Sequence, residues 1–367
     1  MHRDEVLRGS ELADIWEKVK AGERLSYDDG VRLFKCDNFR LVGMMADHVR
    51  RRLHGNRTYY VINQHINYSN ICGNGCKFCA FGRSPESSLA FQLSLEDIIE
   101  KVKERIDEPI TEIHIVGGCH PGLPFSFYLE VLREVKKVRP DVILKAFTAV
   151  EIAHFSKMSG LSEEEVLKKL SEAGLDVLPG GGAEIFSKRV REIVCPRKLS
   201  GEDWLRISGL AHKMGIRSNS TMLFGHVETV EERVDHLVRL RELQDKTGGF
   251  ICFIPLAFQP SNTSLSNLPK VSAIDSLKTI AVSRLILDNI HHIKSYWIML
   301  GISIAQIALH FGADDLDGTV IEEKIGHMAG AESDQALTRS ELTRVIEEAG
   351  FKPVERNTYF DEVKRAA

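Results

Sequence analysis

The sequence lacks long hydrophobic runs and any strong excess of one charge. No stretch of about 18 apolar residues occurs, so nothing predicts a membrane-spanning helix or a membrane partner. The charged start, MHRDEVLRGSELADIW, has no apolar signal-peptide core, so we expect a cytoplasmic location. The 48 Lys and Arg nearly balance the 52 Asp and Glu, and the net charge of −4 argues against nucleic acid as a partner.

Common hydrolase patterns are also missing. There is no GxSxG sequence that would expose a nucleophilic serine, and no cysteine–histidine pair with a supporting context. The chain has no low-complexity tract and no long linker rich in Pro, Gly or Ser. We therefore expect one main domain whose chemistry does not depend on a conventional catalytic triad.

Cysteine is scarce, and its distribution is uneven. The seven cysteines are odd in number and most are far apart, which does not suggest a disulfide framework in a chain of 367 residues. Cys72, Cys76 and Cys79 instead form a CxxxCxxC pattern. The other four stand in apolar or strand-like contexts, where a free thiol usually behaves as a small buried hydrophobe; they are Cys36, Cys119, Cys195 and Cys252.

The hydrophobic pattern predicts helices first and then alternating strands and helices. Residues 1–57 form an N-terminal helical extension, with amphipathic stretches at 12–21 and 28–52. Short apolar or β-branched runs then recur between helical segments. The predicted strands are 59–66, 112–116, 143–147, 175–178, 217–224, 250–256 and 296–300, with a weaker eighth near 315–321.

Sequence signals for helix N-termini lie between and after these predicted strands. Four hydroxyl residues each precede an acidic residue by three positions, as in a capping box; the pairs are Ser94 and Asp97, Ser162 and Glu165, Thr229 and Glu232, and Thr338 and Glu341. Repeated strand–helix units indicate a parallel sheet and favour an α/β fold, a (β/α) barrel that is complete or partly open. We assign residues 58–300 to its core and 301–367 to barrel completion and helices; a doubly wound open sheet is the alternative.

The CxxxCxxC segment directly follows the first predicted strand. In barrels the loops after strands form the active face, so these thiols are expected to face the central cavity. Three thiolates can bind three irons of a four-iron cluster and leave the fourth iron open. The alternative is a structural zinc site in a binding module, with a fourth ligand such as His65 or Cys119.

The cysteine spacing, with Phe78 just before the last cysteine, resembles the signature of the radical S-adenosylmethionine (SAM) superfamily. The resemblance implies that Cys72, Cys76 and Cys79 hold a [4Fe–4S] cluster. It further implies that the amine and carboxylate of the co-substrate SAM bind the open iron. A one-electron donor such as flavodoxin or ferredoxin is then expected to reduce the cluster.

A second segment, VGGCHP, follows the next predicted strand. Gly117 and Gly118 resemble the glycine-rich element of this superfamily that receives the SAM amine on backbone carbonyls. The usual acidic third residue is Cys119 here, so the role of that side chain stays open. Without the preceding cysteine motif, the two glycines would indicate only a strand-end turn.

Further motifs along nearly the whole chain narrow the resemblance to one family. INQHINYSNICGNGCKFCAFGR, KAFTAVEI, LPGGGAEIF, CPRK and TGGFICFIPLAFQP are together similar to the aminofutalosine synthase family of the futalosine route to menaquinone. This implies a radical SAM transferase that adds a 5′-deoxyadenosyl radical to 3-[(1-carboxyvinyl)oxy]benzoate, forming 6-amino-6-deoxyfutalosine. The alternatives are cyclic dehypoxanthine futalosine synthase, which abstracts hydrogen, and deazaflavin (FO) synthase. A homodimer is an additional expectation.

Several polar residues near strand ends are candidate binding residues. Thr148 and Glu151 follow the third strand and are predicted to hold the methionyl group of SAM or the substrate, with a helix cap as the alternative. Glu184, after a glycine run, is predicted to accept hydrogen bonds from ribose hydroxyls, with a position near a helix N-terminus as the alternative. His65 and His226 are candidate catalytic residues, and for His226 we favour contact with the substrate.

The strand predicted over 217–224 carries polar residues in alternation. Arg217, Asn219 and Thr221 should lie on one face of it. If that face is inward, they would meet a carboxylated substrate; otherwise they pack inside the barrel. For Arg217 we favour packing.

Overall fold

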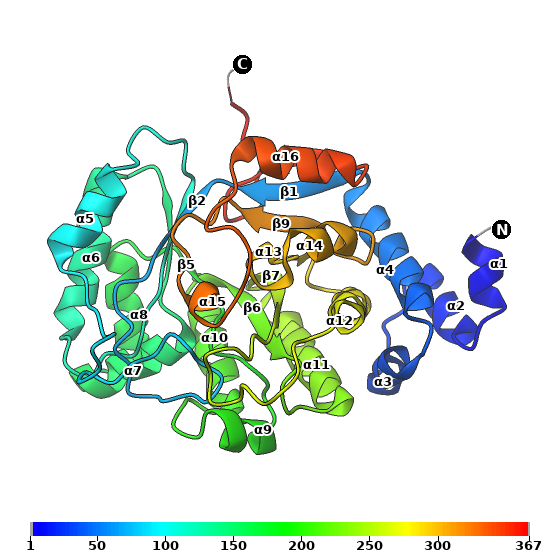
Figure 1. Cartoon of the computed structure of the whole chain (residues 1–367), viewed down its shortest axis with the longest axis horizontal. Helices are drawn as coiled ribbons and strands as arrows, with labels where there is room; N and C mark the ends of the chain where they lie inside the picture. Colours follow the sequence, from blue (N-terminus) through cyan, green and yellow to red (C-terminus); the bar gives the residue numbers. More distant parts are fainter. Residues whose placement is uncertain (1–2, 366–367) are drawn as a thin grey trace.

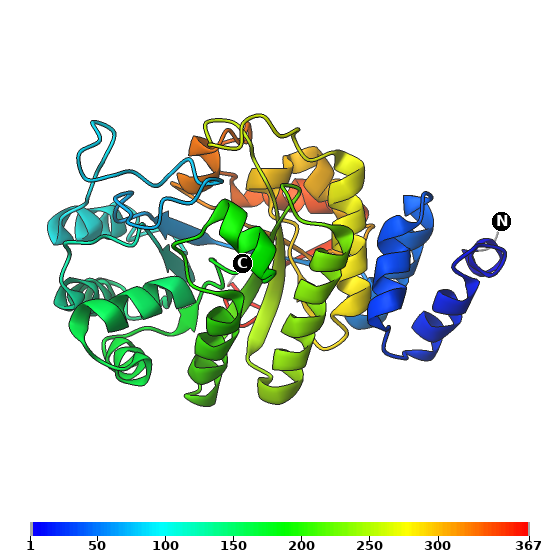
Figure 2. The same ribbon diagram turned by 90° about the horizontal axis from the view of Figure 1, so that it is seen from below.

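A computed structural model describes residues 3–365 and begins with four helices. These are α1 (Arg3–Arg8), α2 (Ala13–Ala21), α3 (Tyr27–Lys35) and α4 (Phe39–His54). The amphipathic stretch at 28–52 is therefore two helices: α3 ends because Cys36 adopts an extended conformation, with φ −62° and ψ 125°. Both views show this group at one end of the molecule, where α4 packs against α12 (Ala273–Ile286) (Figures 1 and 2).

Seven parallel strands form the main sheet, and they lie side by side in chain order. They are β2 (Asn63–Ile66), β3 (Glu112–Ile115), β4 (Ile143–Ala146), β5 (Val177–Leu178), β6 (Arg217–Phe224), β7 (Phe250–Ala257) and β8 (His292–Ile293). Because the order never reverses, the sheet is a partly open (β/α) barrel and not a doubly wound sheet. The predicted barrel class is confirmed.

Helices connect these strands and cover the outer face of the sheet (Figure 1). In chain order they are α5 (Leu95–Lys103), α6 (Phe125–Val138), α7 (Ala149–Ser159), α8 (Glu163–Glu172), α9 (Lys188–Val194), α10 (Gly201–Lys213), α11 (Val230–Thr247) and α12. All four predicted capping boxes are present, at the starts of α5, α8, α11 and α16 (Arg339–Glu348). Among residues 3–365, no helix has both the length and the apolar character that a membrane span requires.

A second, three-stranded sheet lies at the open side of the barrel. Its order is β10 (Lys352–Glu355), β1 (Arg57–Val61) and β9 (Asp315–Gly318), all parallel. The single strand predicted over 59–66 is therefore wrong, because the chain leaves one sheet after Val61 and enters the other at Asn63. Isolated bridges join Gln64 to Ile321 and Lys294 to Asp315, so the segment at 315–321 connects both edges of the main sheet.

The strand predicted over 296–300 is also wrong. β8 ends at Ile293, and residues 297–300 form the short helix α13 (Trp297–Leu300), followed by α14 (Ile302–Ala308) and later by α15 (Ile325–Met328). Trp297 is buried, and its indole N–H donates to the Gly318 carbonyl at 3.0 Å. This tertiary contact favours a helical turn where the local β-propensity of Tyr296, Trp297 and Ile298 favours a strand.

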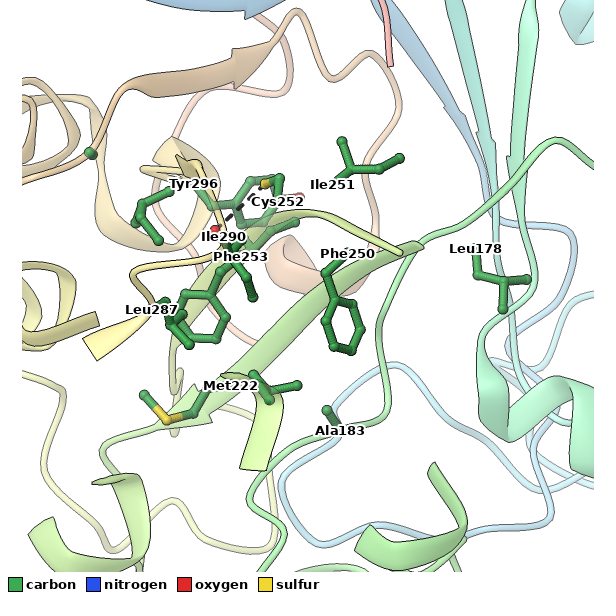
Figure 3. Packing of buried hydrophobic residues seen from close by; sticks show 14 of the residues in the cluster. Leu178, Ala183, Met222, Phe250, Ile251, Cys252, Phe253, Leu287, Ile290 and Tyr296 are labelled. Carbon is green, nitrogen blue, oxygen red and sulfur yellow. Dashed lines mark hydrogen bonds between the residues drawn. The ribbon is translucent and has the colours of Figure 1, made fainter. Parts of the chain in front are cut away.

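The main hydrophobic core lies between the sheet and the helices that cover it. Figure 3 shows part of it, including Leu178 of β5, Met222 of β6, and Phe250 and Phe253 of β7. Each of these side chains is at most 3% exposed. The neighbouring positions along β6, Asn219 and Thr221, face the opposite side and line the barrel interior.

Three buried histidines are held in the neutral form. Burial lowers the pKa of His54 and of His212 to about 4 and that of His236 to about 3. The Nε2 atom of His236 is 2.9 Å from the Thr221 carbonyl, and its ring stacks on Phe186 at 3.9 Å. Protonation of His236 would place an uncompensated positive charge in the core.

The protein should therefore lose stability as the pH falls below 6.5. The unfolded chain binds protons at these histidines near pH 6.5, whereas the folded chain does not until about pH 4. Each histidine should lower the free energy of unfolding by about 1.4 kcal/mol per pH unit in this window. Urea denaturation at pH 7.5, 6.5 and 5.5 measures the slope. His236→Gln should make it shallower, and an unchanged slope in that variant would contradict the assignment.

Candidate active site

A cavity of about 300 Å³ lies inside the barrel, at the carboxyl ends of the strands. Its walls come from the late positions of the strands and from the loops that follow them. Most of the predicted site residues line it: His65, Cys72, Cys76, Phe78, Cys79, Gly117, Gly118, Thr148, Glu151 and Glu184. Segments that are more than 100 residues apart in the chain thus meet at one place.

The other histidine candidate is not part of this wall. His226 does not line the cavity, and both of its ring nitrogens meet backbone groups: Nε2 is 3.0 Å from the Leu223 carbonyl, and Nδ1 accepts from the Val227 N–H at 2.7 Å. These contacts hold the turn after β6. Arg217 is exposed at the start of β6, whereas Asn219 and Thr221 line the cavity.

The cysteine loop is held in place by backbone hydrogen bonds. The Cys72 N–H donates to the Arg83 carbonyl at 2.9 Å, and the Gly73 N–H donates to the Cys119 carbonyl at 3.1 Å. The Lys77 N–H reaches the Val194 carbonyl at 2.8 Å. The loop after β2 is therefore attached to its neighbours on both sides, and its thiols face the cavity.

The surroundings of the three thiols differ in how they affect the thiolate form. The Gly82 N–H donates to Cys79 Sγ at 3.3 Å. A hydrogen bond from the Cys119 thiol, with backbone N–H groups, lowers the pKa of Cys72 to about 5 despite burial. Burial raises the pKa of Cys76 to about 12, and the nearby Lys198 ammonium only partly offsets it. Cys76 thus needs a cationic partner, which a bound metal centre provides.

The spacing of the sulfurs favours a cluster over one zinc ion. Among the described residues, one group of three ligand atoms lies within 4.8 Å of one another, and it comprises His54, His292 and Asp314. The three sulfurs of the cysteine loop do not form such a group, so at least two of them lie more than 4.8 Å apart. A single zinc with bonds of about 2.3 Å would require sulfurs within about 4.6 Å. This arrangement does not suit one zinc ion bound by all three thiols, whereas cysteine thiolates are the usual ligands of a [4Fe–4S] cluster.

The His54, His292 and Asp314 group has a different explanation. Asp314 accepts from the buried guanidinium of Arg284, and His292 Nδ1 is 2.6 Å from its second oxygen. His54 Nε2 is 2.8 Å from the His291 carbonyl. With the Arg284 guanidinium already bound to the carboxylate, this group is a hydrogen-bonded ion pair that does not line the cavity.

The two glycines after β3 are required by close packing. A Cβ atom at Gly118 would lie 2.2 Å from the Ile71 carbonyl oxygen and 2.9 Å from Cys72 Cβ. A Cβ atom at Gly117 would lie 2.7 Å from the Tyr68 ring. The Gly118 N–H also donates to the Ser69 carbonyl at 2.8 Å. The glycine turn therefore rests directly on the cysteine loop, which only residues without a side chain permit.

Thr148 and Glu151 form the capping box of α7, which was the alternative interpretation of this pair. They also line the cavity. Glu151 is buried, accepts from the Tyr68 hydroxyl at 2.8 Å and meets the Gly117 N–H at 3.4 Å. Burial raises the pKa of Glu151 to about 7. The carboxylate thus links α7 to the glycine turn while facing the cavity.

Glu184 and Lys198 form a pair on the wall beside Cys76. Lys198 Nζ lies 2.5 Å from Glu184 Oε1 and 5.3 Å from the centre of the Phe78 ring. Glu184 has a positive φ of 49°, which a residue with a side chain seldom adopts. Such strain clusters at functional sites, because the surrounding structure must hold it. Lys198 belongs to the CPRK segment, to which the sequence assigned no role.

Sequence reasoning missed a polar group deeper in the cavity. Lys145 of β4, Lys294 after β8, Asp317 and Tyr296 all line it. A signal for Lys145 was available, since a charged residue interrupts the apolar run of β4. Lys294 and Asp317 offered none, because the strand boundaries near them were misplaced.

Comparison with known proteins places these features in a family. Residues 66–240 match the Radical SAM superfamily, and residues 247–366 match the CofH/MqnC C-terminal region. An aminodeoxyfutalosine synthase from Thermus thermophilus is 48% identical over 98% of this chain and 97% of its own length. One from Streptomyces coelicolor is 44% identical over 95% and 93%. A cyclic dehypoxanthine futalosine synthase from the same Streptomyces is 36% identical over 96% and 89%.

Solved structures agree on the fold. A methylornithine synthase (PylB) superposes with a TM-score of 0.75 at 19% identity, over 92% of this chain and 97% of that one. The FeFe-hydrogenase maturase HydG from Carboxydothermus hydrogenoformans gives 0.72 at 20% identity, over 98% and 83%. The cysteine loop, the glycine turn and the 48% and 44% identities to aminodeoxyfutalosine synthases agree on one assignment. The chain belongs to the radical SAM superfamily, in the family of the aminodeoxyfutalosine synthases and their relatives.

Proposed function

We propose that this enzyme transfers the adenosyl group of SAM to 3-[(1-carboxyvinyl)oxy]benzoate and forms 6-amino-6-deoxyfutalosine. One observation carries the choice of reaction: identity to aminodeoxyfutalosine synthases is 48% and 44%, against 36% to the cyclic dehypoxanthine futalosine synthase of the same Streptomyces. The C5′–S bond of SAM breaks and methionine leaves, while a new bond joins C5′ to the alkene. The aryl group then moves from the ether oxygen to the adjacent carbon, and the carboxylate on that carbon is lost as bicarbonate or carbon dioxide.

The residues of this chain supply binding and enclosure. Cys72, Cys76 and Cys79 are the ligands for the [4Fe–4S] cluster, and its chemistry when bound is one-electron cleavage of SAM to a 5′-deoxyadenosyl radical. The carbonyls of the turn at Gly117 and Gly118 receive the SAM amine. The position of the cavity inside the barrel limits the access of water and stray hydrogen donors to the reacting carbons.

Glu184 is the residue that we assign to the SAM ribose. Its carboxylate has lone pairs to accept from both ribose hydroxyls, even while Lys198 occupies one oxygen. Thr148 and Glu151 complete the wall on the side of the glycine turn, and Phe78 closes the side of the cysteine loop. For the electron we propose a flavodoxin or a ferredoxin.

Anaerobic reconstitution tests the reaction. Wild-type protein loaded with iron and sulfide, then given dithionite, SAM and the benzoate, should form a nucleoside adduct that contains the benzoate, detected by mass spectrometry. Cys76→Ala should form none, because two thiolates do not hold the cluster. Cleavage of SAM to 5′-deoxyadenosine and methionine alone would keep the superfamily and reject the substrate. Turnover of dehypoxanthine futalosine instead would favour the sibling cyclase.

Replacement of Glu184 tests the ribose assignment. Glu184→Ala should raise the SAM concentration for half-maximal rate by about tenfold to a hundredfold, as expected for a lost charge-assisted hydrogen bond. Glu184→Gln should have a smaller effect, because an amide oxygen still accepts. Equilibrium binding of SAM to the reconstituted protein measures both. Unchanged SAM affinity in Glu184→Ala would remove the assignment.

Replacement of Gly118 tests the packing of the glycine turn. Gly118→Ala should bring the iron content below roughly half of wild type, since its methyl group meets backbone that cannot move without displacing the cysteine loop. Gly122→Ala is the matched control, because a Cβ there meets only His120, at 3.4 Å. Iron and sulfide analysis after reconstitution is the measurement. Equal loading of the two variants would show that the loop tolerates the change.

A further inference from the structure

The floor of the cavity is a row of polar side chains. His65, His114 and Lys145 are register partners across β2, β3 and β4, so they point to the same side of the sheet, and all three line the cavity. Lys294, directly after β8, lines it as well. The next inward position is Asn67, directly after β2 and two residues nearer to the cysteine loop. At about 3.3 Å per residue, the row lies about 7 Å deeper than that position.

The two lysines of this floor are buried. Lys145 is 4% exposed and Lys294 is 2% exposed. Lys145 Nζ lies 2.5 Å from Glu112 Oε1, and Lys294 Nζ lies 2.7 Å from Asp317 Oδ1. An ammonium has three N–H donors. Among the described residues, each lysine has one acceptor within hydrogen-bond distance, so both keep donors for a ligand.

The two lysines interact with each other and with the acids beside them. Burial lowers the pKa of Lys145, Glu112 raises it and Lys294 lowers it again, whereas Asp317 and Asp315 raise the pKa of Lys294 despite its burial. The N–H donors that these acids leave free are the groups available to a ligand carboxylate. In the same row, the buried Nε2 of His114 has no hydrogen-bond partner among the described residues. A buried polar atom without a partner is costly unless a ligand satisfies it.

Apolar side chains on the cavity wall suit the aromatic ring of the benzoate. Leu223, Ile254 and Leu256 line the same cavity and offer an apolar surface for an aromatic ring. In the proposed reaction the alkene must meet C5′ of SAM, near the cysteine loop. The ring carboxylate is then the group farthest from that loop.

From this arrangement we propose that Lys145 and Lys294 bind the ring carboxylate of the benzoate at the cavity floor. The proposal rests on the proposed function for the identity of the ligand. It makes the two lysines specificity-determining residues, which hold the ring so that the alkene lies toward the SAM end of the cavity. They take no part in bond making.

Two unreactive ligands test the site by equilibrium binding to the reconstituted enzyme with SAM. One is 3-[(1-carboxyethyl)oxy]benzoate, which lacks the alkene, and the other is 2-phenoxypropanoate, which also lacks the ring carboxylate. Wild type should bind the first about tenfold to a hundredfold more tightly. Equal affinity for the two would overturn the proposal.

Each lysine is replaced together with its acidic partner, so that no buried carboxylate is left without a counter-ion. Lys145→Met with Glu112→Gln, and separately Lys294→Met with Asp317→Asn, should each lose most of the preference for the ring carboxylate and leave 2-phenoxypropanoate binding unchanged. Asn suits position 317 because its φ is +68°. If both variants bind the two ligands equally more weakly, the lysines have a purely structural role and the proposal is overturned. An unchanged preference for the ring carboxylate in both variants would also overturn it.

A matched ion pair outside the cavity serves as the control. Lys101 Nζ is 2.7 Å from Glu322 Oε2, and neither residue lines the cavity, so Lys101→Met with Glu322→Gln should keep the full preference. Formation of 5′-deoxyadenosine without substrate should stay at the wild-type rate in the Lys101→Met, Glu322→Gln control. A wild type that prefers the ring carboxylate but forms no adduct would reject the proposed function and leave the carboxylate site standing.

Discussion

The contact between the glycine turn and the cysteine loop is the constraint on which the site depends. Parallel strands with helical crossovers bring every strand-end loop to one end of the barrel, and the turns after β2 and β3 are neighbours there. Gly118 lies so close to Ile71 and Cys72 that no side chain fits between them. The position of the thiols is therefore set by backbone packing, and it does not rely on flexible side chains.

A second constraint comes from the charges inside the barrel. Three buried ion pairs lie in the barrel interior: Lys145 with Glu112, Lys198 with Glu184 and Lys294 with Asp317. Buried pairs add little net stability compared with apolar packing, because desolvation offsets their attraction. Their presence in an interior that could have been apolar suggests a role in binding polar ligands. The apolar core between the sheet and the helices provides the stability instead (Figure 3).

The two groups of charged residues lie at different depths in the cavity. Glu184 and Lys198 lie beside Cys76 and Phe78, where a nucleoside would sit. Lys145 and Lys294 belong to the floor, near His65 and His114. A ligand that is polar at one end and carries a carboxylate at the other is complementary to this division. The reactive centre then falls between them, away from water.

The sequence by itself determined the elements whose signals are local. The cysteine spacing, the glycine pair and the four capping boxes depend on residues within a few positions of one another, so each could be predicted. Tertiary structure alone decided where β1 ends and β2 begins, because Val61 and Asn63 pair with strands more than 40 residues away. It also turned residues 297–300 into a helix and brought Lys145 and Lys294 to one floor. These outcomes depend on which distant strand a segment pairs with, and the hydrophobic periodicity of the segment does not predict its pairing partner.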